Sequence, residues 1–248
     1  MLRKVIFILV IVSLLCSVPC YADEVEDLLN YYVKRFTPEK ASLVIAQKPD
    51  KTGLFSDIFM DLEGVVIEKV RLDRLTFRMR GAQFNEPSNW KSGNVECKEA
   101  ISVNALARIY DSDINRAIES KTFGKDGHWH DVSLAITPGG LKGRGYYEAN
   151  AVLFNLDILL EIESGLRIVK AKELWLDNPQ VKVNTLDVPD YITKKALAQI
   201  QPLIDLNKVP LPMSLHKVEL GEGVATLSTR TEPKPLAKGL KYSYPKKK

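Results

Sequence analysis

The chain has 248 residues, of which 45% are hydrophobic and 27% are charged, and its formal net charge is +4. This length and composition are typical of a globular protein built around one domain of ordinary size. A positive charge this small gives no support for a nucleic-acid-binding surface.

The first 22 residues have the pattern of a secretory signal. Arg3 and Lys4 supply a positive start, an apolar run follows over residues 5–15, and a small residue, Ala22, suits a signal peptidase. The run is about half of the ~20 apolar residues that a membrane-spanning helix needs, which favours a cleaved signal over a membrane anchor. We therefore expect residues 1–22 to be removed on export to the periplasm or cell envelope.

The cysteines limit the covalent chemistry of the exported chain. Cys16 and Cys20 lie inside the signal, and neither follows the pattern of a lipid-modified cysteine. Cys97 is then the only cysteine left, which rules out an internal disulfide and is more typical of a small buried hydrophobe than of a reactive thiol. Removal of the signal takes away Arg3 and Lys4 but no acidic residue, so the net charge falls from +4 to +2.

The first part of the mature chain predicts one helix and then strands. Apolar side chains over residues 25–36 repeat with a period of 3.6 after an acidic start, and they predict a helix that ends before Pro38. Residues 41–47 predict a strand. Residues 58–84 alternate apolar and polar side chains with a bend at Gly64 and changes of phase, which predicts bulged strands in a curved sheet.

A second helix is predicted over residues 102–121, with Ser102 as its N-cap. Its apolar stripe would hold Val103, Leu106, Ala107, Tyr110, Ile114, Ala117 and Ile118. Such a helix has one apolar side only, so it must cover the face of a sheet.

Two hairpins are predicted after this helix. Residues 131–137 and 141–148 flank a Pro-Gly-Gly turn, and residues 151–163 and 166–176 flank Ser164-Gly165. Both turns have residue types that favour a reversal between antiparallel strands.

The last part of the chain predicts a helix, a hairpin and a tail. A third helix is expected over residues 190–206, with a kink or an early end at Pro202. Strands follow over residues 214–220 and 224–231. Residues 234–248 contain six lysines and no acidic residue, which is typical of a disordered, solvated tail.

Together these elements predict an α+β fold with a curled, mainly antiparallel sheet and about three helices packed on or inside it. Strands and helices do not alternate, so a doubly wound parallel fold is excluded. We expect one domain over residues 23–233 and a separate tail over residues 234–248.

Few titratable residues have the spacing of a catalytic or metal site. The chain has none of the common nucleotide-binding, serine-hydrolase or zinc-protease motifs. His128 and His130 would share one face of a strand, but Asp131 would point away and His216 is distant in sequence. We therefore predict no metal and no cofactor.

Glu161 and Glu163 are also spaced as a pair on one strand face. A glycosidase would need such a pair beside a groove lined by aromatic and hydrogen-bonding side chains. The apolar neighbours Leu160 and Ile162 do not indicate such a groove, so a solvated strand edge is the preferred interpretation.

The most distinctive pattern is a long apolar strand face. Its members are Val152, Phe154, Leu156, Ile158, Leu160 and Ile162. A filled sheet core and the wall of an apolar cavity require the same residues, so periodicity leaves both interpretations open.

The order of parts resembles the LmeA-like phospholipid-binding family of bacterial envelope proteins. Residues 134–141, where an apolar strand meets a Gly-rich turn, are similar to the central hairpin of the family. Residues 200–205 with 210–212 resemble its late helix and Leu-Pro linker, and residues 218–223 resemble its final hairpin. The predicted helix over residues 102–121 falls in the corresponding place.

The resemblance implies a fold like that of the tubular lipid-binding proteins, in which a long helix is wrapped in a curled sheet. Helices would then close one side of an apolar tunnel, and no catalytic residues are implied. We expect the partner to be a phospholipid or a similar amphiphile, bound for transfer or envelope maintenance. The predicted wall consists of Val152, Phe154, Leu156, Ile158 and Leu160, with Leu106 and Tyr110 on the facing helix.

One further expectation and two alternatives accompany this hypothesis. Lys246, Lys247 and Lys248 would contact anionic lipid headgroups. The main alternative function is a non-catalytic scaffolding domain with a solid core. A hydrolase with an unrecognised site is a weaker alternative.

Overall fold

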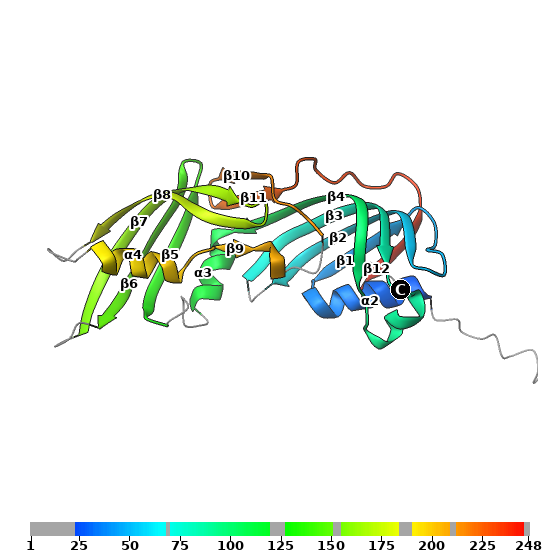
Figure 1. Ribbon diagram of the computed structural model, residues 1–248, viewed down its shortest axis with the longest axis horizontal. Coiled ribbons are helices and arrows are strands. Elements are labelled where there is room, and N and C mark those ends of the chain that lie inside the picture. Colours follow the sequence, from blue (N-terminus) through cyan, green and yellow to red (C-terminus); the bar gives the residue numbers. More distant parts are fainter. Residues whose placement is uncertain are drawn as a thin grey trace, which may run out of the picture.

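The computed structural model describes residues 23–67, 70–119, 127–150, 155–183, 190–208 and 212–245. Its strands form two sheets that follow one another along the long axis of the molecule (Figure 1). Every strand pairing among the described residues is antiparallel. The predicted α+β class and antiparallel pairing are confirmed, although there are two sheets where one was expected.

Among the described residues the larger sheet has seven strands and the smaller has five. Across the larger sheet the order is β10 (Lys217–Gly221), β11 (Val224–Ser228), β4 (Cys97–Tyr110), β3 (Val70–Phe84), β2 (Leu54–Ile67), β1 (Lys40–Ile45) and β12 (Leu240–Tyr244). Across the smaller sheet it is β5 (Trp129–Thr137), β6 (Gly140–Asn150), β7 (Asn155–Val169), β8 (Glu173–Val183) and β9 (Ile204–Asp205).

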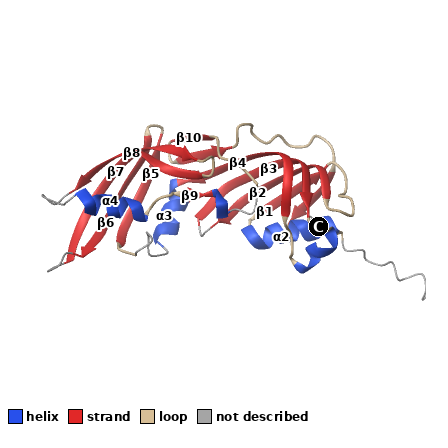
Figure 2. Ribbon diagram, viewed as in Figure 1, coloured by secondary structure: helices blue, strands red, loops and turns tan. Residues whose placement is uncertain are grey.

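The described residues contain three α-helices and two short 3-10 helices, shown in blue in Figure 2. They are α2 (Glu24–Phe36), α3 (Asp111–Glu119), α4 (Asp190–Gln199), η1 (Pro87–Ser92) and η2 (Leu206–Lys208). The longest of them is α2, with 13 residues, and it lies at one end of the larger sheet. The long wrapped helix implied by the family resemblance is therefore not found in the described part of the chain.

Helix α2 closes the outer end of the larger sheet. Its N-cap is Asp23, whose carboxylate accepts a hydrogen bond from the Val25 N–H. The apolar stripe of α2 packs into the sheet: Leu28 is 0% exposed, and the Tyr32 ring lies 5.9 Å from that of Phe77, which is also 0% exposed. This end of the molecule is a filled core, as the helical period of residues 25–36 requires.

The predicted helix over residues 102–121 is wrong in its first half. The chain remains a strand, β4, as far as Tyr110, because it pairs with β3 on one side and β11 on the other. Ala105 and Ile109 are buried on one face, and Arg108 points to the other face, where it binds Asp73. The spacing of apolar residues also fits a helix, but pairing on both edges outweighs that local signal. Helix α3 begins only at Asp111.

The predicted turn at Ser164-Gly165 is also wrong. Strand β7 continues to Val169, and the Ser164 hydroxyl donates to the main-chain oxygen of Asp177 on β8, where the register shifts. The chain reverses at residues 170–172, where Lys170 and Ala171 have φ of 51° and 53°. Non-glycine residues rarely adopt this conformation, so the residue types gave no turn signal.

Helix α3 joins the two sheets. The Asn115 side chain donates to the Leu134 carbonyl and accepts from the Leu134 N–H, both at 2.8 Å, as a neighbouring strand would. Asp111 accepts from the Ile136 N–H, and the Ile136 carbonyl accepts from the Gly223 N–H of the β10–β11 turn. The outer edge of β5 is thereby covered over these residues.

The C-terminal segment also belongs to the fold. After β11 the chain runs along the side of the larger sheet opposite α2 and returns as β12 (Figure 1). Strand β12 pairs with β1, and the Tyr242 hydroxyl donates to Asp23 at 2.9 Å. The expectation of a disordered tail is therefore wrong for residues 240–244, while Lys246, Lys247 and Lys248 lie outside the described residues.

Other predictions agree with the structure. The first helix, the strand over residues 41–47, the hairpin with the Pro-Gly-Gly turn and the final hairpin correspond to α2, β1, β5–β6 and β10–β11. The third helix ends early, at Gln199, three residues before Pro202.

Candidate apolar binding site

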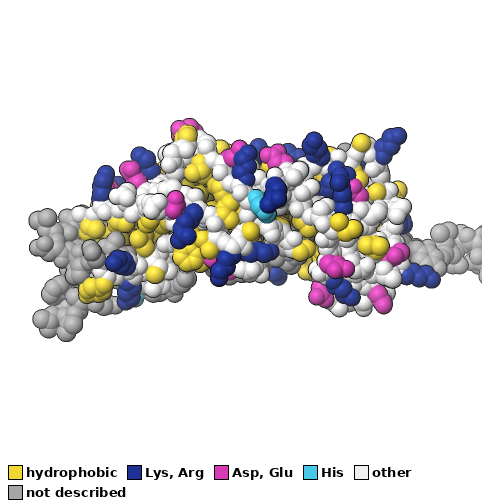
Figure 3. Space-filling model, turned by 45° about the horizontal axis from the view of Figure 1, so that its top comes forward, with side chains coloured by type: hydrophobic (Ala, Val, Ile, Leu, Met, Phe, Trp, Pro, Cys, Tyr) yellow, Lys and Arg dark blue, Asp and Glu magenta, His cyan; other side chains and the backbone are white. Residues whose placement is uncertain are grey.

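An apolar cluster lies where the two sheets meet, and we call it the junction cluster. Leu174, Leu215 and Leu227 are its buried members, at 4%, 4% and 8% exposure. Partly buried hydrophobic residues from both sheets pack against them: Ala107, Leu166, Ile168, Ile204, Leu206 and Val218. Figure 3 shows hydrophobic side chains gathered in the middle of the face of the molecule that it displays.

The structure has a pocket beside this cluster, with a volume of about 50 Å³ and an almost wholly apolar wall. The larger sheet supplies one side of this junction pocket through Leu75, Ala105, Leu106, Ala107 and Leu227. Strand β9 of the smaller sheet and the residues after it supply the other side, through Ile204, Leu206, Met213 and Leu215. Ser214, Ser228 and Thr229 complete the lining. Such a wall suits an alkyl chain better than a polar ligand.

The β7–β8 turn holds one side of the pocket in place. The Leu215 N–H donates to the Ala171 carbonyl and the Leu206 N–H donates to the Lys172 carbonyl, both at 2.8 Å. The Lys172 ammonium in turn donates to the Met213 carbonyl at 2.5 Å. These bonds fix the backbone of η2 and of residues 213–215, which have no strand ladder to hold them.

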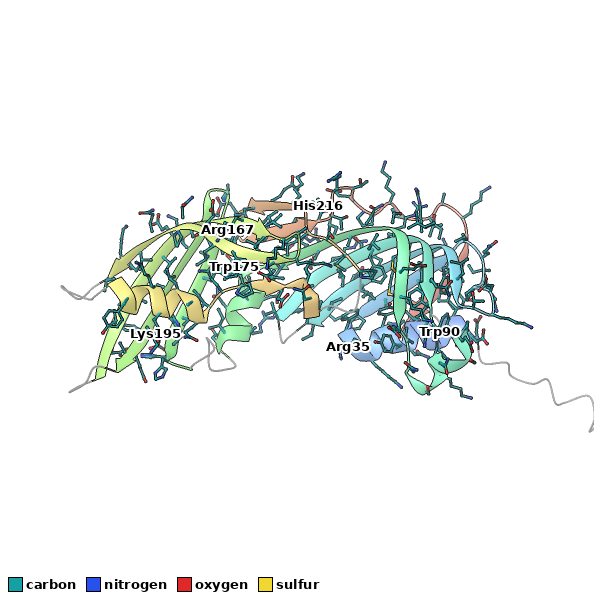
Figure 4. All side chains as sticks on the ribbon, in the orientation of Figure 1. Arg35, Trp90, Arg167, Trp175, Lys195 and His216 are labelled. Atoms are coloured by element: carbon teal, nitrogen blue, oxygen red, sulfur yellow. The ribbon has the colours of Figure 1, made fainter. Side chains whose placement is uncertain are left out.

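Polar and aromatic groups flank the junction. Figure 4 shows Arg167, Trp175 and His216 in the middle of the molecule, between Lys195 at one end and Trp90 at the other. The Arg167 guanidinium lies 5.8 Å from the centre of the Trp175 ring, a cation–π contact. Both side chains come from the hairpin whose turn supports the pocket.

The predicted wall residues are spread over different surroundings. Leu106 lines the junction pocket, but from strand β4, and Tyr110 is at the end of that strand, so neither is on a facing helix. Ile158 and Leu160 are each 1% exposed and belong to the main core.

The remaining wall predictions fall on or beside residues that the structure does not describe. Val152 and Phe154 lie outside the described residues, and Leu156 belongs to β7, with a side chain outside them. The lipid-binding role of the whole set stays a prediction.

Sequence reasoning missed most of the pocket. The sequence pattern places Ile204 in the third helix and Leu206 at its end. It places Met213 in a linker and Leu215 at the start of a strand. The alternation of Val224–Ser228 is a usable signal, since it places Ala225 and Leu227 on the same face.

The candidate catalytic and metal-binding residues form ordinary surface contacts. His130 lies 2.9 Å from Asp157 and 3.2 Å from Asp131, and its ring stacks on Tyr146. The hydrogen bond to Asp157 raises the pKa of His130 above its usual value. The described residues contain no group of three metal-binding side chains.

The remaining candidates are also accounted for. Burial raises the pKa of the Cys97 thiol to about 11, which keeps it protonated and unreactive at neutral pH. Glu163 lies 3.6 Å from Lys142, and both are exposed, as expected of a solvated strand face. His216 is exposed on the segment that enters β10.

In the part of the chain that the structure describes, no helix is long and apolar enough to cross a membrane. Comparisons with curated proteins and with solved structures gave no match. The model of one family, described as LmeA-like phospholipid-binding, matches residues 52–229. This segment is most of the chain and includes every residue that lines the junction pocket. The chain therefore belongs to the LmeA-like phospholipid-binding family.

Proposed function

We propose that this protein is exported to the cell envelope and binds a phospholipid or a similar amphiphile, with an alkyl chain entering the junction pocket. The observation that carries the proposal is the apolar wall of this pocket, which lies inside the segment matched by the family. The binding is physical and involves no covalent step.

The size of the pocket defines what binding requires. Ligand pockets in proteins usually have volumes of at least ~300 Å³, and an apolar cavity that admits benzene has about 150 Å³. The junction pocket has about 50 Å³, so the proposal requires that this arrangement be a closed form that opens to admit a ligand. An alkyl chain enters only when wall residues move, and Met213 and Leu215 are outside the strands and helices.

Energetics favour exchange over storage. Moving a methylene group from water into an apolar pocket is worth about 0.8 kcal/mol. A bilayer buries the same methylene groups, so transfer from a membrane into the protein changes the free energy little. A protein of this kind takes up lipid and releases it again, which suits lipid transfer or envelope maintenance.

The two ends of the chain complete the proposal. Cleavage after Ala22 leaves Asp23 as the first residue, and Asp23 caps α2, binds Tyr242 and lies 3.2 Å from Lys48. The C-terminal Lys246, Lys247 and Lys248 attach the protein to anionic headgroups, at about 1 kcal/mol per lysine near such a surface.

Native mass spectrometry tests the binding. Protein secreted from the full-length chain is delipidated, incubated with vesicles of phosphatidylethanolamine and phosphatidylglycerol, and separated from them. We expect a phospholipid adduct on a polypeptide whose mass is that of a chain beginning at Asp23. Repeated absence of any adduct would contradict the lipid-binding proposal, and a retained N-terminus would contradict the proposed cleavage.

A scaffolding domain with a solid core is the second candidate function. It is favoured by the close packing under α2, where Leu28, Met60 and Phe77 are all 0% exposed. A scaffold would bind an envelope protein and give no lipid adduct in the same measurement. The family match and the apolar pocket favour the first proposal.

A further inference from the structure

Met213 differs from the other methionines of the mature chain. Met60 and Met79 are 0% exposed in strands β2 and β3, inside the core that α2 covers. Met213 belongs to the same core cluster, but it is 7% exposed and lines the junction pocket, on a segment without regular secondary structure.

The wall facing Met213 is comparatively rigid. Leu75, Ala105 and Leu227 are on strands that pair with neighbours on both sides, so their backbone positions are fixed by ladder hydrogen bonds. The Met213 backbone is anchored through its carbonyl, which accepts from the Lys172 ammonium. Its side chain has three rotatable bonds and a polarizable thioether, which lets it take several positions at small cost.

We propose that Met213 is the plug of the junction pocket and sets its affinity for alkyl chains. In the closed form the Met213 side chain occupies the volume that an alkyl chain takes when it binds. This inference rests on the proposed function, because it concerns the same pocket. Met213 would then determine the balance between the closed and open forms of the pocket.

The plug has a measurable consequence. When only a fraction of the molecules is ready to bind, the apparent dissociation constant is the intrinsic constant divided by that fraction. Met213→Ala removes the thioether and its methyl group, which makes the open form the common one. Met213→Phe puts a larger and stiffer side chain in the same place and makes the open form rarer.

The probe is lauroyl lysophosphatidylglycerol, titrated calorimetrically below its critical micelle concentration into the delipidated mature protein. We expect Met213→Ala to lower the apparent dissociation constant about three- to ten-fold, and Met213→Phe to raise it about five-fold or more. Circular dichroism and thermal unfolding establish that each variant is folded. If Met213→Phe does not fold, Met213→Ala alone decides the matter.

Met79→Ala is the matched control, since it makes the same truncation in a buried site away from the pocket. It should lower the thermal stability and leave the dissociation constant within two-fold of the wild-type value, roughly the scatter expected for a distant site. A folded Met213→Ala that binds like wild type, or more weakly, would overturn the plug while leaving lipid binding intact. Absence of binding in wild type and in every variant would overturn both the plug and the proposed function.

Discussion

The α2 end and the junction are both built from apolar side chains on antiparallel strands, yet they are closed differently. At the α2 end a capped helix of 13 residues lies on the sheet, and the core beneath it is filled. At the junction the cover is η2 and residues 213–215, and a pocket of about 50 Å³ is left. In this molecule the cover, and not the strand pattern, decides whether an apolar sheet face becomes a core or a pocket.

The family match divides the molecule along the same line. Residues 52–229 include all residues that line the pocket and none of α2, β1 or β12. The parts outside the match are held to each other: β12 pairs with β1, and Tyr242 binds the N-cap Asp23. The packed end is thus completed by elements that flank the matched segment, whereas the pocket belongs to that segment.

Paired leucine truncations test this comparison most strongly. Leu28 under α2 is 0% exposed and Leu215 at the junction is 4% exposed. Leu28→Ala should lower the free energy of unfolding by about 4 kcal/mol, because it opens a cavity in a rigid core. Leu215→Ala should lower the free energy of unfolding by about 2 kcal/mol, because the irregular segment around it can relax into the space left by the side chain.

Urea unfolding followed by circular dichroism measures both values on the mature protein. Met79→Ala is a second truncation in the packed end. It should lower the free energy of unfolding by about as much as Leu28→Ala does. Equal losses for Leu28→Ala and Leu215→Ala would show that the junction is as rigid as the α2 core and that the two covers do not differ in effect.

The link between the sheets gives the next largest effect. Asn115→Ala removes both hydrogen bonds to Leu134 and should lower the free energy of unfolding by about 2 kcal/mol. Amide hydrogen exchange should show faster exchange of the Leu134 N–H, which loses its acceptor.

Arg116→Ala is the control on the same helix. Its side chain is 71% exposed and pairs with Asp113 at 3.0 Å, so the substitution should cost well under 1 kcal/mol. Unchanged exchange at Leu134 in Asn115→Ala would mean that α3 does not hold the edge of β5.

Much of the fold could be predicted from sequence because its signals are local. The stripe of Leu28 and Tyr32 and the Pro-Gly-Gly turn each depend on neighbouring residues, and α2 and the β5–β6 hairpin form as expected. The errors fall where distant contacts override local preference. Residues 102–110 have a helical spacing but are paired on both edges. The turn in which Lys170 and Ala171 have positive φ is bonded to residues 213–215 through the Ala171 carbonyl and the Lys172 ammonium.

The pocket could be predicted only in its chemistry. An apolar interior was expected, and Leu106 does line the pocket. The other members come from β3, β4, β11, β9, η2 and an irregular segment, and no sequence period relates elements so far apart. Met213 in particular gains its position from a lysine donating to its carbonyl, which leaves no pattern in the sequence.

The smallest expected effect concerns an exposed polar contact between strands of the five-stranded sheet. His130 on β5 binds Asp157 on β7 and stacks on Tyr146 of β6, with ring centroids 5.3 Å apart. The hydrogen bond to Asp157 raises the pKa of His130, and Asp131 acts in the same direction. A raised pKa in the folded state means that protonation stabilises the fold.

This stabilisation is present in full below about pH 6.5 and is lost as the pH rises through the higher pKa of the folded protein. Because the group is exposed, we expect wild type to lose less than about 1 kcal/mol between about pH 5 and pH 8 relative to His130→Gln. His128→Gln is the control and should keep the wild-type difference, since His130 and Asp157 remain in place. Identical pH profiles for wild type and His130→Gln would show that this contact adds nothing to the strand pairing and packing that join β5, β6 and β7.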